Sequence, residues 1–268
     1  EARYELVKTM RASILVLGSM VAKYGYAKIA LPGGCAIGSR PVNYHLNALE
    51  KLGAEISLNN GYIEAKAKKL IGANIEFEGV TVTGTENLMM AASLADGLTV
   101  LTNVAKEPEI SDLADFLNSM GAKISGAGTD EIRIEGVEEL TGTTFKIPAD
   151  RIEAGTYLVA AAITNGKITI KKIDSARMGS IIETLQKAGA EVCLNENSIS
   201  IDMTKNTIKP VDIVTAPFPG FPTDMQAQFT VLNCIGHGES SVKETIFENR
   251  FMHVQELNRM GTDITING

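Results

Sequence analysis

The sequence comprises 268 residues, of which 44% are hydrophobic, with a net charge of −7 and a pI near 5.2. This composition is typical of a globular protein with a sizeable core, and the acidic balance argues against a broad nucleic-acid-binding face. The three cysteines, Cys35, Cys193 and Cys234, lie far apart and form no CxxC pair, which argues against zinc binding and favours a reducing compartment.

The N-terminal segment EARYELVKTMRAS has the pattern of neither a signal peptide nor a membrane anchor. The apolar run that follows, SILVLGSMVA, is too short to cross a bilayer. We therefore expect a cytoplasmic protein without a membrane partner. The chain starts without Met and stops at DITING, within a predicted strand, so we also expect it to be a fragment.

One phrase recurs four times along the chain, and the recurrence predicts a repeated module. The copies are LEKLGAEI (49–56), LNSMGAKI (117–124), LQKAGAEV (185–192) and LNRMGTDI (257–264). Their glycines, Gly53, Gly121, Gly189 and Gly261, are 68, 68 and 72 residues apart. This period is longer than that of common solenoid repeats, so each copy is expected to be one supersecondary unit.

Each copy begins with an apolar helical pattern, at 13–25, 87–97, 155–166 and 226–238, and each pattern closes on a glycine suited to a left-handed helix end. A strand pattern follows at 27–33, 98–104, 167–173 and 240–246. A second helix then ends at the shared phrase, where its glycine caps the helix and another strand starts. Further short strands are predicted at 61–67, 131–137 and 198–203, which gives an α/β fold built by duplication.

Two of the first helices, at 88–97 and 154–164, are apolar on nearly every side. This pattern predicts that sheets enclose them. A domain boundary is expected between the second and third copies, where Pro148 precedes a capping pattern from Asp150 to Glu153. We therefore predict one domain at 1–147 and a second at 148–268.

The loop LPGGCAIGSRP (31–41) places Cys35 among glycines and prolines, between a strand and a helix. Gly33 and Gly34 permit backbone angles that other residues avoid, and Arg40 can hold an anion and favour the thiolate. A reactive thiol and a buried structural cysteine are both consistent with this pattern. Cys193 and Cys234 lie within strand and helix patterns and are expected to be structural.

The segment APFPGFPTDMQAQF (216–229) places Asp224 at the start of an apolar helix. An acid there can cap the helix together with Gln226, or it can serve as a positioned catalytic base. The segment FENRFMH (247–253) brings together Glu248, Arg250 and His253, for which a solvated charged face is the simplest interpretation.

Seven segments, in order and at matching spacing, resemble the UDP-N-acetylglucosamine 1-carboxyvinyltransferase family. They are MRAS, LPGGCAIGSRPV, EPEI, GTDEIRIEGVE, PADRIEAGTY, FPTDMQAQF and FENRFMHVQEL. The resemblance implies an inside-out α/β fold of two domains with three repeats each, of which four are present here. It implies transfer of the enolpyruvyl group of phosphoenolpyruvate to the 3-hydroxyl of UDP-N-acetylglucosamine, with release of phosphate, in bacterial peptidoglycan synthesis. No metal or organic cofactor is implied.

The same resemblance assigns roles to individual residues. Cys35 is similar to the general acid that protonates the methylene carbon of phosphoenolpyruvate and that fosfomycin alkylates, and Asp224 to the base that takes the proton of the sugar hydroxyl. Positions around the nucleotide sugar match Arg11, Arg40, Pro41, Val42, Asn43, Tyr44 and His45, and the uridine-side walls match Gly79, Val80, Thr81, Val82, Ile246 and Phe247. Glu248 and Arg250 resemble further active-site residues. From the residues alone, a surface cation is the simpler interpretation of Arg11, and a satisfied polar group is the simpler interpretation of His45.

Asn43 stands where the family commonly has Asp, and Gly79 where many members carry Lys. The family's N-terminal Lys-Asn segment and C-terminal repeat have no counterpart, so we expect this chain to be inactive alone and a longer version to be active. Two alternatives stay open: the shikimate-pathway enolpyruvyl transferase, which lacks the Pro-Gly-Gly-Cys loop, and a noncatalytic repeat scaffold.

Overall fold

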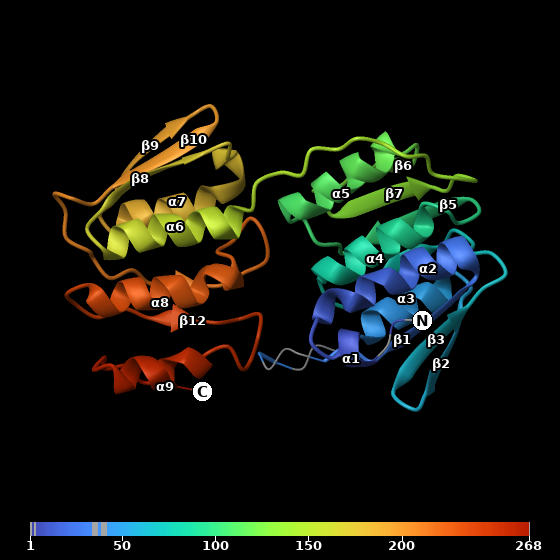
Figure 1. Ribbon diagram of the computed structural model, residues 1–268, viewed down its shortest axis with the longest axis horizontal. Coiled ribbons are helices and arrows are strands. Elements are labelled where there is room, and N and C mark those ends of the chain that lie inside the picture. The colour runs from blue at the N-terminus through green and yellow to red at the C-terminus, as the bar shows by residue number, and fades with distance from the viewer. Residues whose placement is uncertain (1, 3, 34–36, 39–41, 268) are drawn as a thin grey trace. The chain divides into compact units, whose positions relative to one another are not determined.

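A computed structural model describes residues 2, 4–33, 37–38 and 42–267. The chain forms two compact units, coloured blue to green and yellow to red in Figure 1. Unit 1 comprises Glu1–Ala36 and Arg40–Lys146, and unit 2 comprises Ile37–Ser39 and Ile147–Gly268. Within the described residues, no helix has the length and apolar character needed to span a bilayer.

Unit 1 holds the first two repeats. The first contains α1 (Tyr4–Val7), η1 (Arg11–Leu15), α2 (Val16–Tyr24), β1 (Tyr26–Ala30), α3 (Asn43–Lys51), β2 (Glu55–Asn59) and β3 (Tyr62–Lys66). The second contains β4 (Asn74–Glu76), α4 (Val82–Ala92), β5 (Leu98–Thr102), α5 (Pro108–Ser119), β6 (Lys123–Ser125) and β7 (Glu131–Glu135). Their sheets have the orders β1-β3-β2 and β4-β5-β7-β6, and β4 runs parallel to β5. The strand β4 was not predicted from the sequence.

Unit 2 holds the third and fourth repeats. The third contains α6 (Arg151–Ile163), β8 (Lys167–Lys171), η2 (Ser175–Met178), α7 (Gly179–Lys187), β9 (Glu191–Asn195) and β10 (Ser198–Asp202). The fourth contains β11 (Ile213–Val214), η3 (Thr223–Met225), α8 (Gln226–Ile235), β12 (Val242–Lys243) and α9 (Met252–Arg259). The sheet β8-β10-β9 is antiparallel, and β11 pairs with β12 in parallel.

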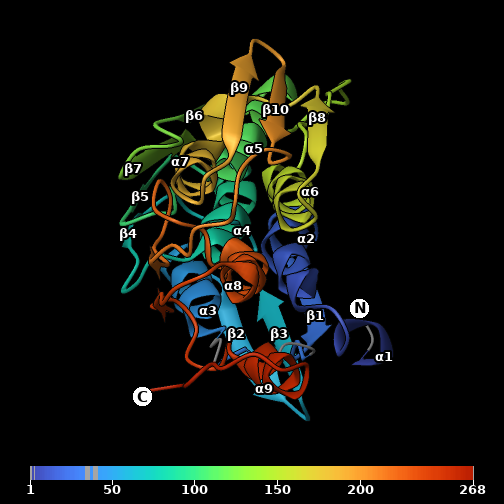
Figure 2. The same ribbon diagram turned by 90° about the vertical axis from the view of Figure 1, so that its left-hand side faces the viewer.

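Each unit is arranged with helices inside and sheets outside. In unit 1, helices α2, α3 and α4 lie between the two sheets (Figure 1). In unit 2, α6 and α7 cover one face of the sheet β8-β10-β9 (Figure 2). Strands such as β5 and β7 alternate buried and exposed residues, as expected where one sheet face packs on helices and the other meets solvent. This inside-out arrangement confirms the predicted fold class.

The prediction of enclosed helices holds for α4 and is wrong for α6. Seven of the eleven residues of α4 are buried, including Asn87 and Thr85. Helix α6 instead packs with one side against α8, β8 and β10, and its other side carries Tyr157, whose exposed fraction is 54%. The small, apolar composition of α6 therefore does not reflect burial on every side.

The four recurring glycines share one backbone conformation. Their φ angles are +91° at Gly53, +102° at Gly121, +100° at Gly189 and +102° at Gly261. Only glycine adopts such angles without strain, so the repeated phrase marks four equivalent helix ends, as predicted.

Two details of the repeats differ from prediction. Gly25 ends α2 in the left-handed conformation, as predicted, but α4 ends at Ala92, before Gly97. Asn165 rather than Gly166 is left-handed after α6, and α8 ends at an extended Gly236, before Gly238 with its φ of +134°. Residues 262–267 form no strand, although one was predicted there. In the other repeats this strand pairs with a following one, as β9 does with β10, and no such partner follows among the described residues of the fourth.

Candidate functional site

In unit 1, the candidate residues gather at the N-terminal ends of α3 and α4. Val42 is the N-cap residue of α3, and Asn43, Tyr44 and His45 form its first turn. Thr81 is the N-cap of α4, and its hydroxyl accepts a hydrogen bond from the Gly84 amide at 3.1 Å. A side-chain cap therefore positions the end of α4, whereas Val42 makes no such bond and the end of α3 is held by packing on the unit 1 core.

The structure brings Tyr44 and Gly79 into contact. A Cβ atom at Gly79 would lie 3.1 Å from the Tyr44 hydroxyl, so a larger side chain there would crowd the ring. Beyond Gly79, the side chain of Val80 is exposed, whereas Val82 packs partly buried against the core.

His45 is buried, with an exposed fraction of 3%, and both of its ring nitrogens have partners. The Asn87 amide nitrogen donates to Nδ1 at 3.0 Å, and Nε2 lies 3.4 Å from the hydroxyl of Thr83. The Asn87 amide oxygen accepts from the Gly18 amide at 2.8 Å, which fixes the orientation of the side chain. Since Nδ1 accepts, the ring is neutral and carries its proton on Nε2.

Burial, and to a lesser extent the positive charge of Arg11, lowers the pKa of His45 to about 4. Arg11 begins η1, the short helix that leads into α2. These features match a satisfied core histidine, and they make His45 a fixed hydrogen-bonding group rather than a source of protons near neutral pH.

In unit 2, Asp224 and Arg250 form an ion pair. The Arg250 Nη2 donates to Asp224 Oδ1 at 2.7 Å, and the guanidinium lies 5.4 Å from the centre of the Phe247 ring. Among the described residues, no donor contacts the second oxygen, Oδ2. The carboxylate is 59% exposed and the arginine side chain 20%.

The interpretation of Asp224 as a helix cap is wrong. Asp224 lies inside η3, and its side chain caps neither η3 nor α8. The predicted partner Gln226 is fully buried, and its amide has no hydrogen-bond partner among the described residues. Arg250, expected by default on a solvated face, is instead largely buried against Phe247 and paired with the aspartate.

Cys35, Arg40 and Pro41 lie outside the described residues. Two neighbours of Cys35, Ile37 and Gly38, group with unit 2. The Asn249 amide donates to the Ile37 carbonyl at 2.9 Å, and a Cβ at Gly38 would lie 2.5 Å from Oε2 of Glu248. This part of the glycine-rich loop therefore lies against Glu248, whose side chain would have to move to admit a residue larger than glycine.

Two acidic residues of interest, Glu86 and Glu244, were not predicted from the sequence. The pKa of Glu86, in α4, is raised to about 7 by burial and then by the negative charges of Glu109 and Glu107. Its only signal in the sequence was an acid directly before the apolar helix pattern at 87–97. Glu244 accepts hydrogen bonds from four donors, and its position directly after a short strand gave no signal at all.

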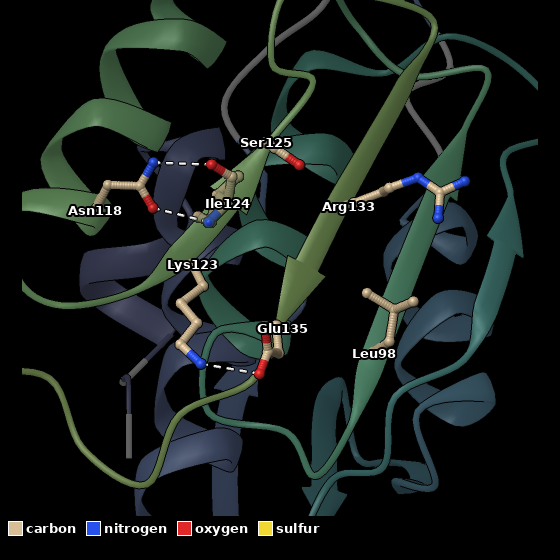
Figure 3. Close-up of a pocket in the computed structure, with 7 residues that line it drawn as sticks. All are labelled: Leu98, Asn118, Lys123, Ile124, Ser125, Arg133 and Glu135. Atoms are coloured by element: carbon tan, nitrogen blue, oxygen red, sulfur yellow. Dashed lines mark hydrogen bonds and ion pairs between the residues drawn. The ribbon is translucent and has the colours of Figure 1, made fainter.

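The surface pocket drawn in Figure 3 contains none of the candidate residues. It is an open depression of about 520 Å³ on the outer face of the sheet β4-β5-β7-β6. Its charged residues are already paired, since Lys123 bonds Glu135 at 2.9 Å and Arg133 bonds Glu131 at 2.8 Å. Asn118 bonds both the amide and the carbonyl of Ile124. No group of three or more His, Cys, Asp or Glu residues in the described parts of the chain is placed to hold a metal ion.

Repeated α/β modules with helices inside and sheets outside define the enolpyruvyl transferase fold. The enolpyruvyl transferase NikO from Streptomyces tendae superposes with a TM-score of 0.85 at 21% identity, over 99% of this chain and 63% of that one. An EPSP synthase from Acinetobacter baumannii gives a TM-score of 0.68 at 20% identity, over 97% of this chain and 62% of that one.

The chain belongs to the EPSP synthase (3-phosphoshikimate 1-carboxyvinyltransferase) family, whose sequence profile matches residues 1–268. It is 59% identical over 268 residues to a UDP-N-acetylglucosamine 1-carboxyvinyltransferase of Hydrogenovibrio crunogenus. It is 61% identical over 267 residues to the enzyme of the same name from Ruthia magnifica. In both comparisons the whole chain is covered, and it spans 64% of the relative's length.

Proposed function

We propose that the protein transfers the enolpyruvyl group of phosphoenolpyruvate to the 3-hydroxyl of UDP-N-acetylglucosamine and releases phosphate, the first committed step of peptidoglycan synthesis. The observation that carries this proposal is the 59% identity over the whole chain to an enzyme of that name. The solved EPSP synthase from Acinetobacter baumannii is only 20% identical, so shikimate 3-phosphate is the weaker candidate for the acceptor.

The chemistry needs one base and one acid. Asp224 takes the proton of the sugar 3-hydroxyl as that oxygen attacks C2 of phosphoenolpyruvate, while the Cys35 thiol delivers a proton to the methylene carbon. In the elimination step the Cys35 thiolate takes a proton from the new methyl group as the bond from carbon to the phosphate oxygen breaks, and the proton held by Asp224 leaves with the phosphate. Proton balance is therefore kept within the two residues and the substrates, without a cofactor.

The surroundings of Asp224 support its role as the base. Its carboxylate is accessible, and one oxygen is held by Arg250 while Oδ2 meets no donor among the described residues. A fixed carboxylate with one open oxygen is the arrangement that proton transfer from a bound hydroxyl requires. As a partly buried cation on this carboxylate, Arg250 also stabilises negative charge that develops on nearby oxygens.

The ends of α3 and α4 support the binding of the nucleotide sugar in unit 1. Neutral His45, held by Asn87 and Thr83, fixes the first turn of α3, which carries Asn43 and Tyr44. Helix N-termini attract phosphate because their backbone amides point outward. We therefore assign the diphosphate and sugar contacts to this turn together with Arg11 and Arg40, and the uridine contacts to residues 79–82, Ile246 and Phe247.

The remaining assignments follow from the same proposal. Phosphoenolpyruvate and UDP-N-acetylglucosamine are the substrates, fosfomycin is a covalent inhibitor at Cys35, and the reaction takes place in the bacterial cytoplasm.

The test is an assay of phosphate release from phosphoenolpyruvate with either UDP-N-acetylglucosamine or shikimate 3-phosphate as the acceptor. It compares this chain with a version extended at both ends to the length of the relatives. We expect turnover with the nucleotide sugar in the extended version and little or none in this chain. Turnover with shikimate 3-phosphate, or with neither acceptor, would refute the proposal.

A further inference from the structure

The carboxylate of Glu244 joins three separate segments of unit 2. The residue follows β12 directly. Its Oε1 accepts from the Thr215 hydroxyl at 2.9 Å, the Ile246 amide at 2.8 Å and the Phe247 amide at 3.2 Å. Its Oε2 accepts from the Thr223 hydroxyl at 2.8 Å. Both oxygens are therefore used, and the donors come from the end of β11, from η3 and from the loop after β12.

The first of these segments, the end of β11, is buried and well bonded. Thr215 is fully buried at the end of β11, which pairs with β12 in parallel. Its hydroxyl also accepts from the Thr245 amide at 2.9 Å, and its carbonyl accepts from the Thr245 hydroxyl at 2.6 Å. Glu244 is thus bonded to a buried residue at the end of a paired strand, and the hydroxyl and carbonyl of that residue both have hydrogen-bond partners.

The other two segments carry the two halves of the ion pair. Thr223 directly precedes Asp224, and Phe247 lies beneath the guanidinium of Arg250. One carboxylate therefore bonds the side chain of the residue before Asp224 and the backbone of the segment that leads to Arg250. The bonds to the amides of Ile246 and Phe247 are local and form a turn in many proteins. The bond to Thr223 spans 21 residues and has no such local explanation.

We propose that Glu244 is a positioning residue that fixes the orientation of Asp224 through the Thr223 hydroxyl. The inference rests on the proposed function, because it assigns the base of that reaction to Asp224. A misplacement of a catalytic group by about 1 Å can lower turnover by about two orders of magnitude, so a single hydrogen bond of this kind has a measurable effect.

The experiment uses the extended protein and three substitutions. Thr223→Val removes the hydroxyl, and we expect kcat to fall by about 10-fold or more while KM for each substrate changes by less than about twofold. Thr223→Ser keeps the hydroxyl and should recover most of kcat. Because Thr223 and Glu244 act in series, Thr223→Val combined with Glu244→Gln should lower kcat no further than the more severe single substitution.

The matched control is Thr204→Val. Thr204 also donates its hydroxyl to a carboxylate of unit 2, Asp202 Oδ1, at 2.6 Å, but it lies beyond β10 and contacts none of the candidate residues. The Thr204→Val substitution should leave kcat unchanged. An unchanged kcat in Thr223→Val, a loss that Thr223→Ser does not reverse, or additive effects in the double variant would each overturn the inference.

A crystal structure of Thr223→Val separates this inference from the proposed function, because it requires no turnover. We expect the distance between Arg250 Nη2 and Asp224 Oδ1 to exceed about 4 Å, or the Asp224 side chain to occupy more than one conformer. A retained contact at the distance of the parent protein would overturn the positioning role whatever the reaction is. Failure of the parent protein to release phosphate would instead refute the function.

Discussion

Arg250 donates a hydrogen bond from Nη2 to Oδ1 of Asp224 across 2.7 Å, joining the two most informative sequence segments of the second unit. The aspartate lies in η3, directly before α8, and the arginine lies directly before α9. Charge-assisted bonds of this length are among the stronger hydrogen bonds in proteins. The pair therefore gives Asp224 a defined orientation, which an exposed aspartate would otherwise lack.

Replacement of Asp224 by Asn should separate catalysis from stability. The amide keeps the size and can still contact a hydroxyl, but it cannot take a proton, so kcat for phosphate release should fall by about 100-fold or more. The side chain is 59% exposed and caps no helix, and the amide oxygen can still accept from Arg250, so loss of the ion pair should lower the free energy of unfolding by about 1 kcal/mol or less. Steady-state kinetics and urea denaturation of the extended protein provide the two measurements. Retention of near-parental kcat would remove Asp224 from the mechanism.

His45 should make unit 1 less stable in acid. Its pKa is about 4 in the folded chain and 6.5 in the reference state, so the unfolded chain takes up the proton first as the pH falls. The contribution of neutral His45 to the free energy of unfolding is complete above pH 6.5. It falls by about 3 kcal/mol as the pH is lowered towards 4. His45→Gln should abolish this dependence, although it also weakens the bond to Asn87 and lowers stability at every pH.

Glu86 should act in the opposite direction. Its pKa is raised from 4.5 to about 7, so the folded chain holds the proton more tightly, and stability is lost as the pH rises through that window. The two effects oppose each other in one unit. Urea denaturation from pH 4.5 to 7 should show stability falling with rising pH in His45→Gln and rising with pH in Glu86→Gln. Parallel profiles in the two variants would contradict the assignment.

The recurring glycines offer a matched pair of substitutions. Gly121 and Gly189 have φ angles of +102° and +100°, but a Cβ at Gly121 meets nothing within 4 Å, whereas one at Gly189 would lie 2.9 Å from the Thr207 carbonyl oxygen. Gly121→Ala should cost about 1–2 kcal/mol from backbone strain alone, and Gly189→Ala about 1 kcal/mol more from the added clash. Gly142→Ala, in open space at an ordinary φ, is the control. Equal losses of unfolding free energy at Gly121 and Gly189 would show that backbone strain alone sets the cost and that the clash adds nothing.

Gln226 should tolerate the loss of its amide. The side chain is fully buried, and neither its oxygen nor its nitrogen has a partner among the described residues. Burying an unsatisfied polar group costs about 1–3 kcal/mol, and Met has a similar length without the amide. Gln226→Met should therefore leave the free energy of unfolding unchanged or raise it by about 1–2 kcal/mol. A loss of stability would indicate that the amide makes hydrogen bonds in solution.

Local patterns predicted much of the fold. The cap at Asp150 is present, with its Oδ1 accepting from the amides of Ile152 and Glu153 at 2.7 and 3.1 Å, and the second helix of every repeat ends at the shared phrase. These features depend on residues a few positions apart, which a sequence displays directly. The short strands β4 and β11 were missed because their pairing depends on partners far along the chain.

The candidate site could be predicted only in part for the same reason. The segments around Asp224 and Arg250 were identified, but their contact across 26 residues was not. Glu244 has donors 29 and 21 residues away, and the burial of His45 depends on Asn87, 42 residues away. Long-range hydrogen bonds leave no periodic pattern in a sequence. The substrate contacts assigned to these residues stay predictions.

The most direct test of the proposed mechanism is mass spectrometry of the extended protein after exposure to fosfomycin in the presence of UDP-N-acetylglucosamine. We predict one covalent adduct, at Cys35, together with loss of phosphate release. Cys193, which is exposed, and Cys234, which is partly buried, are internal controls, because the mechanism gives neither thiol a role. Both should stay unmodified. An absence of the adduct at Cys35, or undiminished turnover in Cys35→Ser, would contradict the assignment of this thiol as the acid of the reaction.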